Sequence, residues 1–555
     1  MRKLLTFILL LFITQANSQT PPWEWARCPI GGGVGSAWEE SYSIASDHSG
    51  NVYLSGFFND TSLIIGSYNF SSVGSNDILI AKYDSSGNVV WATSVGGSGS
   101  DECNSIAVDD SQNIYITGEF TSPTISFGSF TLTNSGAGWN TFIVKYNSSG
   151  TVVWAKNSKA TGTNNSKNIA VDSWGNSYIT GLYNSPIIVF DADTLMNTAA
   201  GFTDAFIVKY NPTGSILWTK NIGGVLSENC TAVNVDISGN IFISGIFSSP
   251  TLSVDSFSLT CSGGVDLFLA RLDSLGNVIW CKSYGGIGSD NSYSLTSDLT
   301  GKIYLTGLFS SPILIFGNDT LYQTGNSDAF LIKFDSLGNI IWAKSSIGAG
   351  GEIGYCVITD TLGSIYLSGS FNDILGMSFD SATLFPPANS FDPMFIIKFD
   401  SAGNAIWNQT LQSGGDDQNS IALGQNGSLY VGGDFYNVNP FILGCDTLIR
   451  SASEVVFVAK LGHNLCPDST ISVNEINQKI SYAIFPNPFE EKLNIVMKNN
   501  EQSQIFLYDI ISRKLLQQNF SNSTTLDTRG FSNGIYIYQV KNSKGIIANG
   551  KLVKQ

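Results

Sequence analysis

Carboxylates recur at one fixed place in this sequence, five residues before each of seven similar strand-like segments. Six of the seven positions are acidic, and the remaining one is Asn164. The acidic members, called the acidic ring below, are Glu39, Asp101, Glu228, Asp290, Glu352 and Asp416. Carboxylate oxygens are the ligands that Ca²⁺ prefers, so acids gathered around one mouth of a channel would bind Ca²⁺ or a cationic ligand. A position that every repeat uses more often serves the repeat itself, however, which favours an architectural role.

Basic residues recur at a second fixed position, in the third strand-like segment of each repeat. They are Lys82, Lys145, Lys209, Arg271, Lys333, Lys398 and Lys460. Carboxylates in loops accept backbone N–H groups and form strong hydrogen bonds with basic side chains. We therefore predict that each acid of the ring lies within ion-pair reach of one of these basic residues.

Residues for other kinds of chemistry are sparse. The chain has two histidines, His48 and His463, and neither has a neighbouring nucleophile to activate. Its eight cysteines form no Cys-x-x-Cys pair, which removes a structural zinc site. Glycine-rich stretches such as 96–99 lack the Gly-Lys-Ser/Thr ending and the following helix of a phosphate-binding loop. We therefore predict no cofactor, apart from the Ca²⁺ considered at the acidic ring.

These residues belong to a repeat of 62 to 64 residues. Its first signature holds an aromatic residue, at Tyr53, Tyr115, Tyr178, Phe242, Tyr304, Tyr366 and Tyr430, and its second ends in a tryptophan strand. Both signatures alternate apolar and polar residues and are separated by Asp-x-x-Gly turns, which is typical of strands joined by hairpins. Each repeat thus holds at least four strands, with an additional hairpin expected between the second and the third.

Seven four-stranded repeats predict an all-β fold, a seven-bladed β-propeller over residues 19–462. The seventh repeat stops before its tryptophan strand, and the missing strand is found at 22–28, which holds Trp23 and Trp25. We predict that this strand completes the last blade and closes the ring. The repeats resemble the SBBP-type β-propeller family over about Trp23 to Leu461, through the motif Asp-x-x-Gly-Asn-x-Tyr-x-x-Gly. The resemblance implies a propeller and no particular activity.

The two ends of the chain have a different character. Arg2 and Lys3 precede the apolar run 4–13 and then small residues up to Ser18, which predicts a secretory signal peptide over 1–18. That run is too short to span a bilayer and no other run approaches the required length, so no transmembrane segment is predicted. Export permits disulfides, and Cys466, just after the last repeat, is the best candidate for a bridge that staples the closure. Residues 463–481 are expected to form a linker, and 482–555 a small C-terminal β-sandwich.

The C-terminal segment carries a recognisable set of motifs. They are Pro486, Asn487 and Pro488, then Tyr508 and Asp509, and a strand with Gly534 and Tyr536. Together they resemble the type A C-terminal sorting domain of the type IX secretion system of Bacteroidetes. The resemblance implies that the type IX machinery is a partner. It also implies passage through the periplasm and across the outer membrane, followed by attachment to the cell surface or release.

Charge and loop composition narrow the function of the repeats. The net charge of −16 argues against nucleic-acid binding. Insertions vary between repeats, as at 190–193, 318–320 and 385–387, and exposed aromatic residues in such loops would suit sugar stacking. We therefore favour a secreted or cell-surface propeller that acts as a non-enzymatic binding or adhesion module for glycans or proteins. The alternative is a secreted carboxylate-dependent polysaccharide-degrading enzyme, because two suitably spaced acids suffice for that chemistry.

Overall fold

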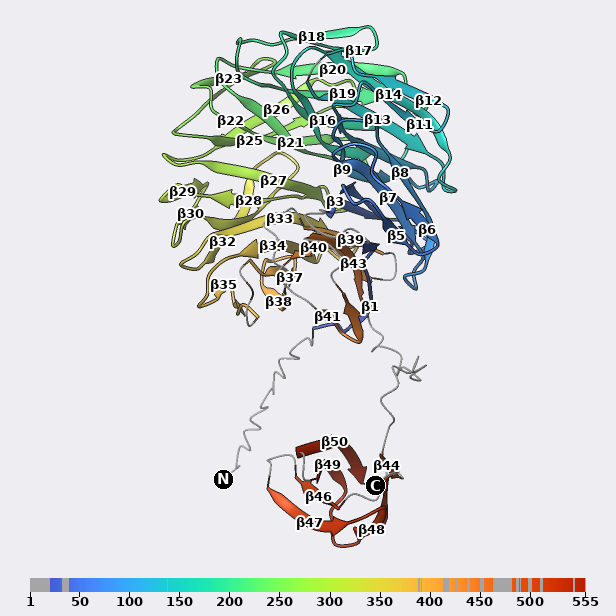
Figure 1. Cartoon of the computed structure of the whole chain (residues 1–555). Coiled ribbons are helices and arrows are strands. Elements are labelled where there is room, and N and C mark those ends of the chain that lie inside the picture. Colours follow the sequence, from blue (N-terminus) through green and yellow to red (C-terminus); the bar gives the residue numbers. More distant parts are fainter. Residues whose placement is uncertain are drawn as a thin grey trace, which may run out of the picture. The chain divides into compact units, whose positions relative to one another are not determined.

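The computed structural model describes residues 20–31, 39–462 and 482–554, apart from 137, 388–389, 391, 413–418, 425–426, 437–439, 450–453, 486–488, 490, 498–501, 510–512 and 543–544. The chain divides into two compact units, Met1–Asp468 and Ser469–Gln555. Every named element is a β-strand (Figure 1). Within the described ranges, no helix has the length and apolar character needed to cross a membrane.

Each repeat folds into a four-stranded antiparallel sheet. In sheet 1, β3 (Glu39–Ser46), β4 (Val52–Phe58), β7 (Asp77–Tyr83) and β8 (Val89–Val95) pair in chain order. Sheets 2 to 6 repeat this order. Sheet 2 holds β9 (Asp101–Val108), β10 (Ile114–Phe120), β13 (Asn140–Tyr146) and β14 (Val152–Ala160), and sheet 3 holds β15 (Asn164–Val171), β16 (Ser177–Tyr183), β19 (Asp204–Tyr210) and β20 (Ile216–Ile222). Sheet 4 holds β21 (Glu228–Val235), β22 (Ile241–Phe247), β25 (Asp266–Leu272) and β26 (Val278–Tyr284), sheet 5 holds β27 (Asp290–Ser297), β28 (Ile303–Phe309), β31 (Asp328–Phe334) and β32 (Ile340–Ile347), and sheet 6 holds β33 (Glu352–Thr359), β34 (Ile365–Phe371), β37 (Met394–Phe399) and β38 (Ala405–Leu411).

Sheet 7 combines strands from both ends of the first unit. The last repeat supplies β39 (Ser420–Leu423), β40 (Leu429–Tyr436) and β43 (Glu454–Leu461), and the N-terminal segment supplies β1 (Trp23–Arg27). Strand β1 pairs antiparallel with β43, with Trp25 opposite Lys460 and Ala26 opposite Ala459. The N-terminal strand therefore occupies the place of the outer tryptophan strand of the other sheets.

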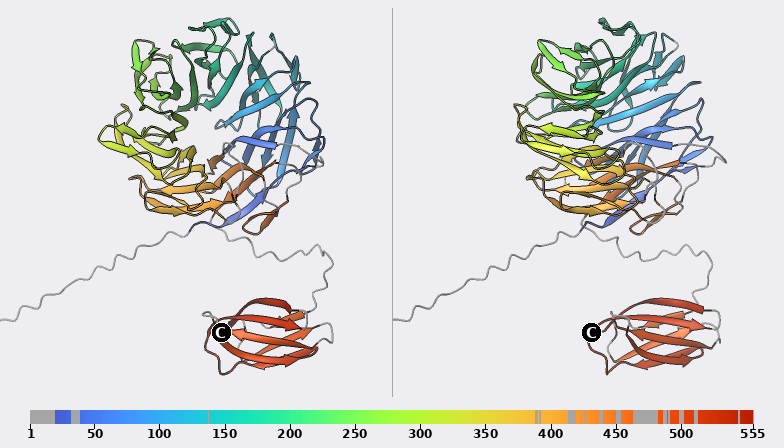
Figure 2. Two further views of the ribbon diagram at one scale, coloured as in Figure 1. Left: turned by 60° about the vertical axis from the view of Figure 1, so that its left-hand side comes forward. Right: turned by 90° about the vertical axis from the view of Figure 1, so that its left-hand side faces the viewer.

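The sheets are arranged about a common axis. Their first strands contact one another in a closed circle, β3, β9, β15, β21, β27, β33, β39 and again β3. Figure 2 (left) shows the sheets grouped radially around this axis. The hydrophobic core lies between neighbouring sheets, where Ile78 and Ile80 of sheet 1 pack with Ile114 and Ile116 of sheet 2. This is the architecture of a closed β-propeller.

The additional hairpin predicted between the second and third strands is present. The hairpins are β5 (Leu63–Ile65) with β6 (Tyr68–Phe70), β11 (Thr124–Phe127) with β12 (Phe130–Thr133), β17 (Ile187–Phe190) with β18 (Asp193–Met196), β23 (Thr251–Val254) with β24 (Phe257–Thr260), β29 (Ile313–Phe316) with β30 (Asp319–Tyr322), β35 (Met377–Phe379) with β36 (Ala382–Leu384), and β41 (Phe441–Leu443) with β42 (Asp446–Leu448). Strand β2 (Ile30–Gly31) pairs with β5. Two hairpins extend the outer edge of the preceding sheet, as where Phe190 lies opposite Ser158. They cover strand edges that would otherwise be open to pairing with other chains.

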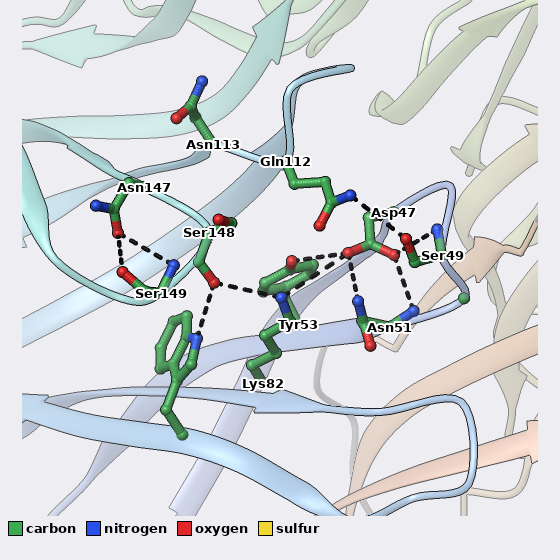
Figure 3. A network of polar contacts seen from close by, with 12 residues as sticks. Asp47, Ser49, Asn51, Tyr53, Lys82, Gln112, Asn113, Asn147, Ser148 and Ser149 are labelled. Carbon is green, nitrogen blue, oxygen red and sulfur yellow. Dashed lines mark hydrogen bonds and ion pairs between the residues drawn. The ribbon is translucent and has the colours of Figure 1, made fainter.

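The Asp-x-x-Gly turns are held by their own aspartate. In the first turn, the Asp47 carboxylate accepts the backbone N–H groups of Ser49 and Asn51, each at 2.9 Å, and the Tyr53 hydroxyl at 2.9 Å (Figure 3). Gly50 adopts a φ of 79°, a conformation that residues with a Cβ rarely take. The motif is therefore a self-satisfied turn that also anchors the aromatic residue of the next strand.

The recurrent basic residues connect each sheet to the next one. Lys82 lies over the Tyr53 ring, 5.0 Å from its centroid, and donates to the Ser148 carbonyl of sheet 2 (Figure 3). The Trp91 indole donates to the same carbonyl at 3.4 Å. The lysine and tryptophan signatures thus form one contact between neighbouring sheets.

The same contact joins sheet 7 to sheet 1. Lys460 and the Trp25 indole both donate to the Ser85 carbonyl, at 3.2 and 3.0 Å. A strand from the start of the chain therefore makes the inter-sheet contact that Trp91 makes in sheet 1.

The second unit is a small β-sandwich, as predicted. Its strands are β44 (Tyr482–Phe485), β45 (Lys492–Met497), β46 (Ser503–Tyr508), β47 (Lys514–Phe520), β48 (Ser523–Asp527), β49 (Gly534–Asn542) and β50 (Gly545–Lys554). They form one sheet in the order β44-β45-β48 and another in the order β47-β46-β49-β50. Between them lies a core that includes Phe489, Leu493, Leu507 and Val540.

Candidate ligand-binding site

The described members of the acidic ring are buried, and each is the first residue of the first strand of its sheet, where consecutive sheets join. Glu39, Asp101, Glu228, Asp290 and Glu352 are at most 1% exposed, and Asp416 lies outside the described residues. The Asp101 carboxylate accepts the Gly97 N–H at 2.7 Å and the Ser122 hydroxyl at 2.7 Å. These contacts are to backbone and hydroxyl groups of the same junction.

The prediction that each of these acids pairs with a recurrent basic residue is wrong for the five described members. The ion pairs of the described chain use other acids, as between Lys460 and Glu24 at 2.8 Å. The strand register explains this: in sheet 2, Asp101 lies opposite Phe120, whereas Lys145 lies opposite Tyr115. Five residues along a strand separate the acid from the base by roughly 17 Å.

Two of the junction acids are in a strongly unfavourable place for a charge. Burial, with Asp60 beside it, raises the pKa of Glu39 to about 8, and burial, with Asp328 beside it, raises the pKa of Glu352 to about 8. Metal ligands must be deprotonated, and these carboxyls keep their protons at neutral pH. Among the described residues, no group of three or more His, Cys, Asp or Glu is placed to hold a metal.

The histidines and cysteines of the chain lie in several different environments. His48 lies in an exposed turn, with Nε2 2.9 Å from a carboxylate oxygen of Asp110. Cys103 and Cys230 are buried free thiols, and Cys445 is disulfide-bonded. His463 and Cys466 fall outside the described residues, so the bridge proposed for Cys466 stays a prediction.

The hairpin aromatics differ in their exposure. Phe190 is 1% exposed and packs against Phe206, with ring centroids 5.3 Å apart. It faces the core side of β17, so the sugar-stacking role expected for it is wrong. Phe385 in the corresponding region of sheet 6 is 67% exposed.

The first strands of the seven sheets enclose a cavity of about 180 Å³ on the common axis. Each sheet contributes two lining residues. They are Tyr42, Ser43, Asn104, Ser105, Lys167, Asn168, Asn229, Thr231, Tyr293, Ser294, Tyr355, Cys356, Asn419 and Ser420. One charged residue, Lys167, is found among these fourteen. The cavity is therefore polar, mostly uncharged and assembled from every repeat.

One row of residues, six of which line the cavity, links the first strands around the axis. We call it the stitching row: Ser43, Ser105, Asn168, Ala232, Ser294, Cys356 and Ser420. In five sheets the side-chain oxygen of this row accepts a backbone N–H of the next sheet. Ser43 accepts from Ile106 at 3.3 Å, Ser105 from Ile169 at 3.3 Å, Asn168 from Val233 at 3.2 Å, Ser294 from Val357 at 3.1 Å and Ser420 from Ile44 at 3.3 Å. A serine hydroxyl that accepts in this way keeps its own proton to donate.

The residue just before the stitching row differs from sheet to sheet. This variable row is Tyr42, Asn104, Lys167, Thr231, Tyr293, Tyr355 and Asn419. Tyr293 and Tyr355 come from adjacent sheets, and their rings pack edge to face with centroids 5.6 Å apart. The variable row therefore gives each side of the cavity its own chemistry on a repeated backbone.

Hydrogen bonds fix the orientation of two cavity amides. Asn104 donates to Glu119 at 3.1 Å and to the Ser166 carbonyl at 2.7 Å, and Asn419 donates to the Gly369 carbonyl at 3.1 Å. Because a carbonyl oxygen only accepts, the NH₂ group of Asn419 must face Gly369 and its Oδ1 must face away. Asn419 is 6% exposed and its Oδ1 has no partner among the described residues. Asn229 Oδ1 is likewise unpartnered.

Two acids lie behind the lining near Lys167. Glu102 and Glu119 face each other across β9 and β10, and burial, with Glu102 as a further cause, raises the pKa of Glu119 to about 7. Both Glu119 oxygens accept amide groups, from Asn104 and Asn165. This pair is therefore engaged in holding the cavity wall.

Sequence inspection missed the cavity because its residues do not repeat. A signal was nevertheless present in the first strands. Their recurring Ile, Leu or Val packs into the core, so neighbouring residues of the same strand must point toward the axis. That set is polar in all seven sheets, at Tyr42, Asn104, Lys167, Thr231, Tyr293, Tyr355 and Asn419.

The predicted sorting residues fall in the sandwich or outside the described chain. Pro486, Asn487 and Pro488 lie outside the described residues. Asp509 accepts from Arg513 at 3.0 Å in an exposed turn after Tyr508. Gly534 opens β49, and the nearby Tyr536 is 7% exposed and donates its hydroxyl to the Ser532 carbonyl.

Comparison with known families supports both parts of the sequence interpretation. Residues 483–555 match the family described as a secretion system C-terminal sorting domain, and residues 90–119 match the SBBP β-propeller repeat. The suspected combination of an SBBP propeller repeat with a type IX sorting domain is thereby confirmed. The sorting domain indicates export through the type IX system to the cell surface or beyond it.

More distant similarities extend over the repeats. An uncharacterized WD repeat-containing protein of Acanthamoeba polyphaga mimivirus is 25% identical over 541 residues, covering 79% of this chain and 39% of that protein. The regulatory protein FlaEY of Caulobacter vibrioides is 29% identical over 125 residues, covering 22% of this chain and 13% of that protein. The chain thus spans well under half the length of these relatives.

Among solved structures, the similarity is low. A protein of unknown function from Dyadobacter fermentans has 9% identity and a TM-score of 0.35, covering 79% of this chain and 98% of its own. A fungal alcohol oxidase in complex with copper has 11% identity and a TM-score of 0.36, covering 97% and 100%.

Proposed function

We propose that this protein is a secreted β-propeller that binds glycans, without transforming them, in the cavity on its axis. Residues 1–18 direct it to the periplasm as a signal peptide, and the C-terminal domain takes it across the outer membrane through the type IX machinery. The acidic ring serves the junctions between sheets. Recognition is left to the variable row.

The observation that carries this proposal is the contrast between the two rows of the cavity. The stitching row repeats nearly the same chemistry and bonds the protein to itself, whereas the variable row holds four residue types, tyrosine, asparagine, lysine and threonine, around the circle. Recognition of one ligand needs unlike groups at defined places, which a repeated residue cannot supply.

The groups offered suit a sugar. The serine hydroxyls of the stitching row have protons to donate, whereas the unpartnered Oδ1 atoms of Asn229 and Asn419 are fully buried and out of a ligand's reach. A sugar hydroxyl accepts as well as donates, so one ring can accept hydrogen bonds from several of these serines. The packed Tyr293 and Tyr355 rings add an apolar surface for the face of a pyranose. These features favour a glycan over a protein as the ligand.

The enzymatic alternative has weaker support. Of the two acids near the cavity, Glu119 is 5% exposed and both of its oxygens accept amide hydrogen bonds. A general acid must reach the bond that it cleaves. We therefore assign Glu119 to positioning of Asn104 and Asn165 rather than to catalysis.

A glycan array with the purified full-length protein tests the proposal. We expect binding by the wild type, and a loss of about three- to tenfold in affinity for Tyr293→Ala, because an aromatic contact contributes about 0.5–1.5 kcal/mol beyond burial. Tyr322→Ala is the matched control, because Tyr322 is 61% exposed on the outer hairpin β30. The proposal fails if no glycan binds, if both variants bind like the wild type, or if the bound polysaccharide is cleaved.

A further inference from the structure

Lys167 is exceptional among the residues around the cavity. It occupies the place held by tyrosine, asparagine or threonine in the other sheets, and it is the one charged side chain among the fourteen lining residues. It is half-buried, and its ammonium group makes no hydrogen bond or ion pair among the described residues. Glu102 and Glu119 supply opposite charge through space, but no described residue accepts a hydrogen bond from the ammonium group, which keeps its N–H donors for a ligand.

The acids nearest to Lys167 are committed elsewhere. Glu102 accepts from Asn76 at 2.8 Å, and Glu119 accepts from Asn104 and Asn165. Both influence Lys167 only through space, because no carboxylate oxygen of the described chain lies within 4.0 Å of its ammonium group. These amide hydrogen bonds thus hold Glu102 and Glu119 in the wall of the cavity, and the ammonium group of Lys167 stays available to a ligand.

The dimensions of the cavity limit what can approach that cation. Its volume of about 180 Å³ is below the 300–1,000 Å³ that is usual for a drug-sized ligand. First strands from all seven sheets surround it, so a ligand can enter only along the axis. A polymer cannot pass sideways through such a ring, but the end of a chain can be inserted.

Building on the proposed function, we infer that the cavity takes the terminal sugar of an acidic glycan, whose ring carboxylate binds the ammonium group of Lys167. The carboxylate accepts from Lys167, while the sugar hydroxyls accept from the stitching serines. The ligand is therefore a carboxylate-bearing pyranose at the end of a chain.

Calorimetric titration of the full-length protein with three oligosaccharides of equal length tests this inference. One ends in glucuronic acid, one ends in glucose, and one carries glucuronic acid inside the chain with glucose at its end. We expect the wild type to bind the first more tightly than the other two by at least tenfold, because a hydrogen bond between charged groups contributes about 1.5–3 kcal/mol. Higher salt should weaken binding of the first probe alone.

The decisive variant is Lys167→Thr, which introduces the residue that sheet 4 carries at the same place. We expect it to lose roughly ten- to hundredfold in affinity for the acidic end and to bind the neutral end like the wild type. Lys159→Thr, at an exposed position on β14, should leave all three affinities unchanged. Thermal unfolding of both variants checks that each is folded.

The possible failures are distinguishable. Equal wild-type affinity for acidic and neutral ends, or an unchanged acidic affinity in Lys167→Thr, overturns the role of Lys167 and leaves glycan binding intact. Equal affinity for terminal and internal glucuronic acid overturns insertion of the chain end. If none of the three probes binds but other glycans do, the inference alone fails, and if no glycan binds, the proposed function fails with it.

Discussion

The junction between sheets 2 and 3 and the junction between sheets 7 and 1 solve the same packing problem with different groups. In the first, Asn164 is fully buried and donates to the Trp139 and Gly162 carbonyls at 2.9 and 3.0 Å. Its own Oδ1 accepts the Ser185 hydroxyl at 2.9 Å. Every polar atom of this amide is satisfied without a charge.

At the junction between sheets 7 and 1, Glu39 takes the place of Asn164 and Asp60 takes the place of Ser185. Both acids are fully buried, and neither carboxyl oxygen of Glu39 has a hydrogen-bond partner among the described residues. Burial raises the pKa of Glu39 to about 8, so this carboxyl keeps its proton at neutral pH. The acidic ring is thus a tolerated position with a local cost, which Glu39 shows where the circle closes and Glu352 shows between sheets 5 and 6.

The largest effect that this comparison predicts is on the pH dependence of stability. The folded-state pKa of Glu39 is about 8, against an ordinary value of 4.5, so the folded protein holds a proton that the unfolded chain has lost between these values. Stability should therefore fall as pH rises from about 4.5 to 8, by up to about 1.4 kcal/mol per pH unit for this group, and level off above pH 8. Glu352 adds a second contribution of the same sign.

Glu39→Gln should remove the contribution of Glu39 to this pH dependence of stability. The variant is expected to equal the wild type near pH 4.5 and to exceed it in stability at pH 8, since an amide carries no charge and can donate to the unpartnered Asp60 Oδ2. Chemical denaturation at a series of pH values measures this, with Asp273→Asn in an exposed turn as the control. If the free energy of unfolding changes with pH in the same way in the wild type and in Glu39→Gln, the buried acid does not distinguish the two junctions.

A smaller effect is expected when the neutral junction is converted into the acidic kind. Asn164→Asp loses the two donated bonds to Trp139 and Gly162 and places a carboxylate against those carbonyl oxygens, which should cost about 1–3 kcal/mol at neutral pH. Lowering the pH should restore part of this loss by protonating the new carboxyl. Asn197→Asp, at a partly exposed site just after β18 in the same repeat, is the matched control, because Asn197 likewise donates to a backbone carbonyl. A loss that does not depend on pH would mean that the amide geometry, rather than charge, distinguishes the junctions.

Repetition decided how much of this structure could be predicted from sequence. The tryptophan strand missing from the seventh repeat pointed to Trp25, and the Asp-x-x-Gly motif pointed to turns such as the one at Asp47. The partners of the acids were predicted wrongly because both acid and base recur in every repeat, while the pattern does not tell which end of the sheet each occupies. The register of β9 and β10 supplies that information.

The cavity escaped prediction for a related physical reason. Simple alternation along β3 would place Ser41 and Ser43 on one face, but the strand has a bulge between these two residues. The bulge turns Tyr42 and Ser43 together toward the axis, where both line the cavity. Bulges leave little trace in a single sequence. Gly56 is one such trace, because a Cβ at that position would collide with the Glu40 carbonyl beside the bulge.

The smallest expected effect concerns a hydrogen bond that both junctions contain, from a backbone N–H to a serine of the stitching row. Ser105 and Ser420 each accept a backbone N–H of the next sheet at 3.3 Å, to Ile169 and to Ile44. Ser105→Ala and Ser420→Ala should therefore each cost about 1 kcal/mol, because each leaves one backbone N–H without its acceptor, and Ser105→Ala also removes the longer contact of 3.4 Å from the Asn168 amide. Sheet 4 already carries Ala232 at this place, so the substitution fits the backbone. Denaturant midpoints for the two variants provide the measurement. A clearly larger loss for Ser420→Ala would show that the closing junction is weak in its strand contacts as well as in its buried acids, since the same bond would then support a less stable interface.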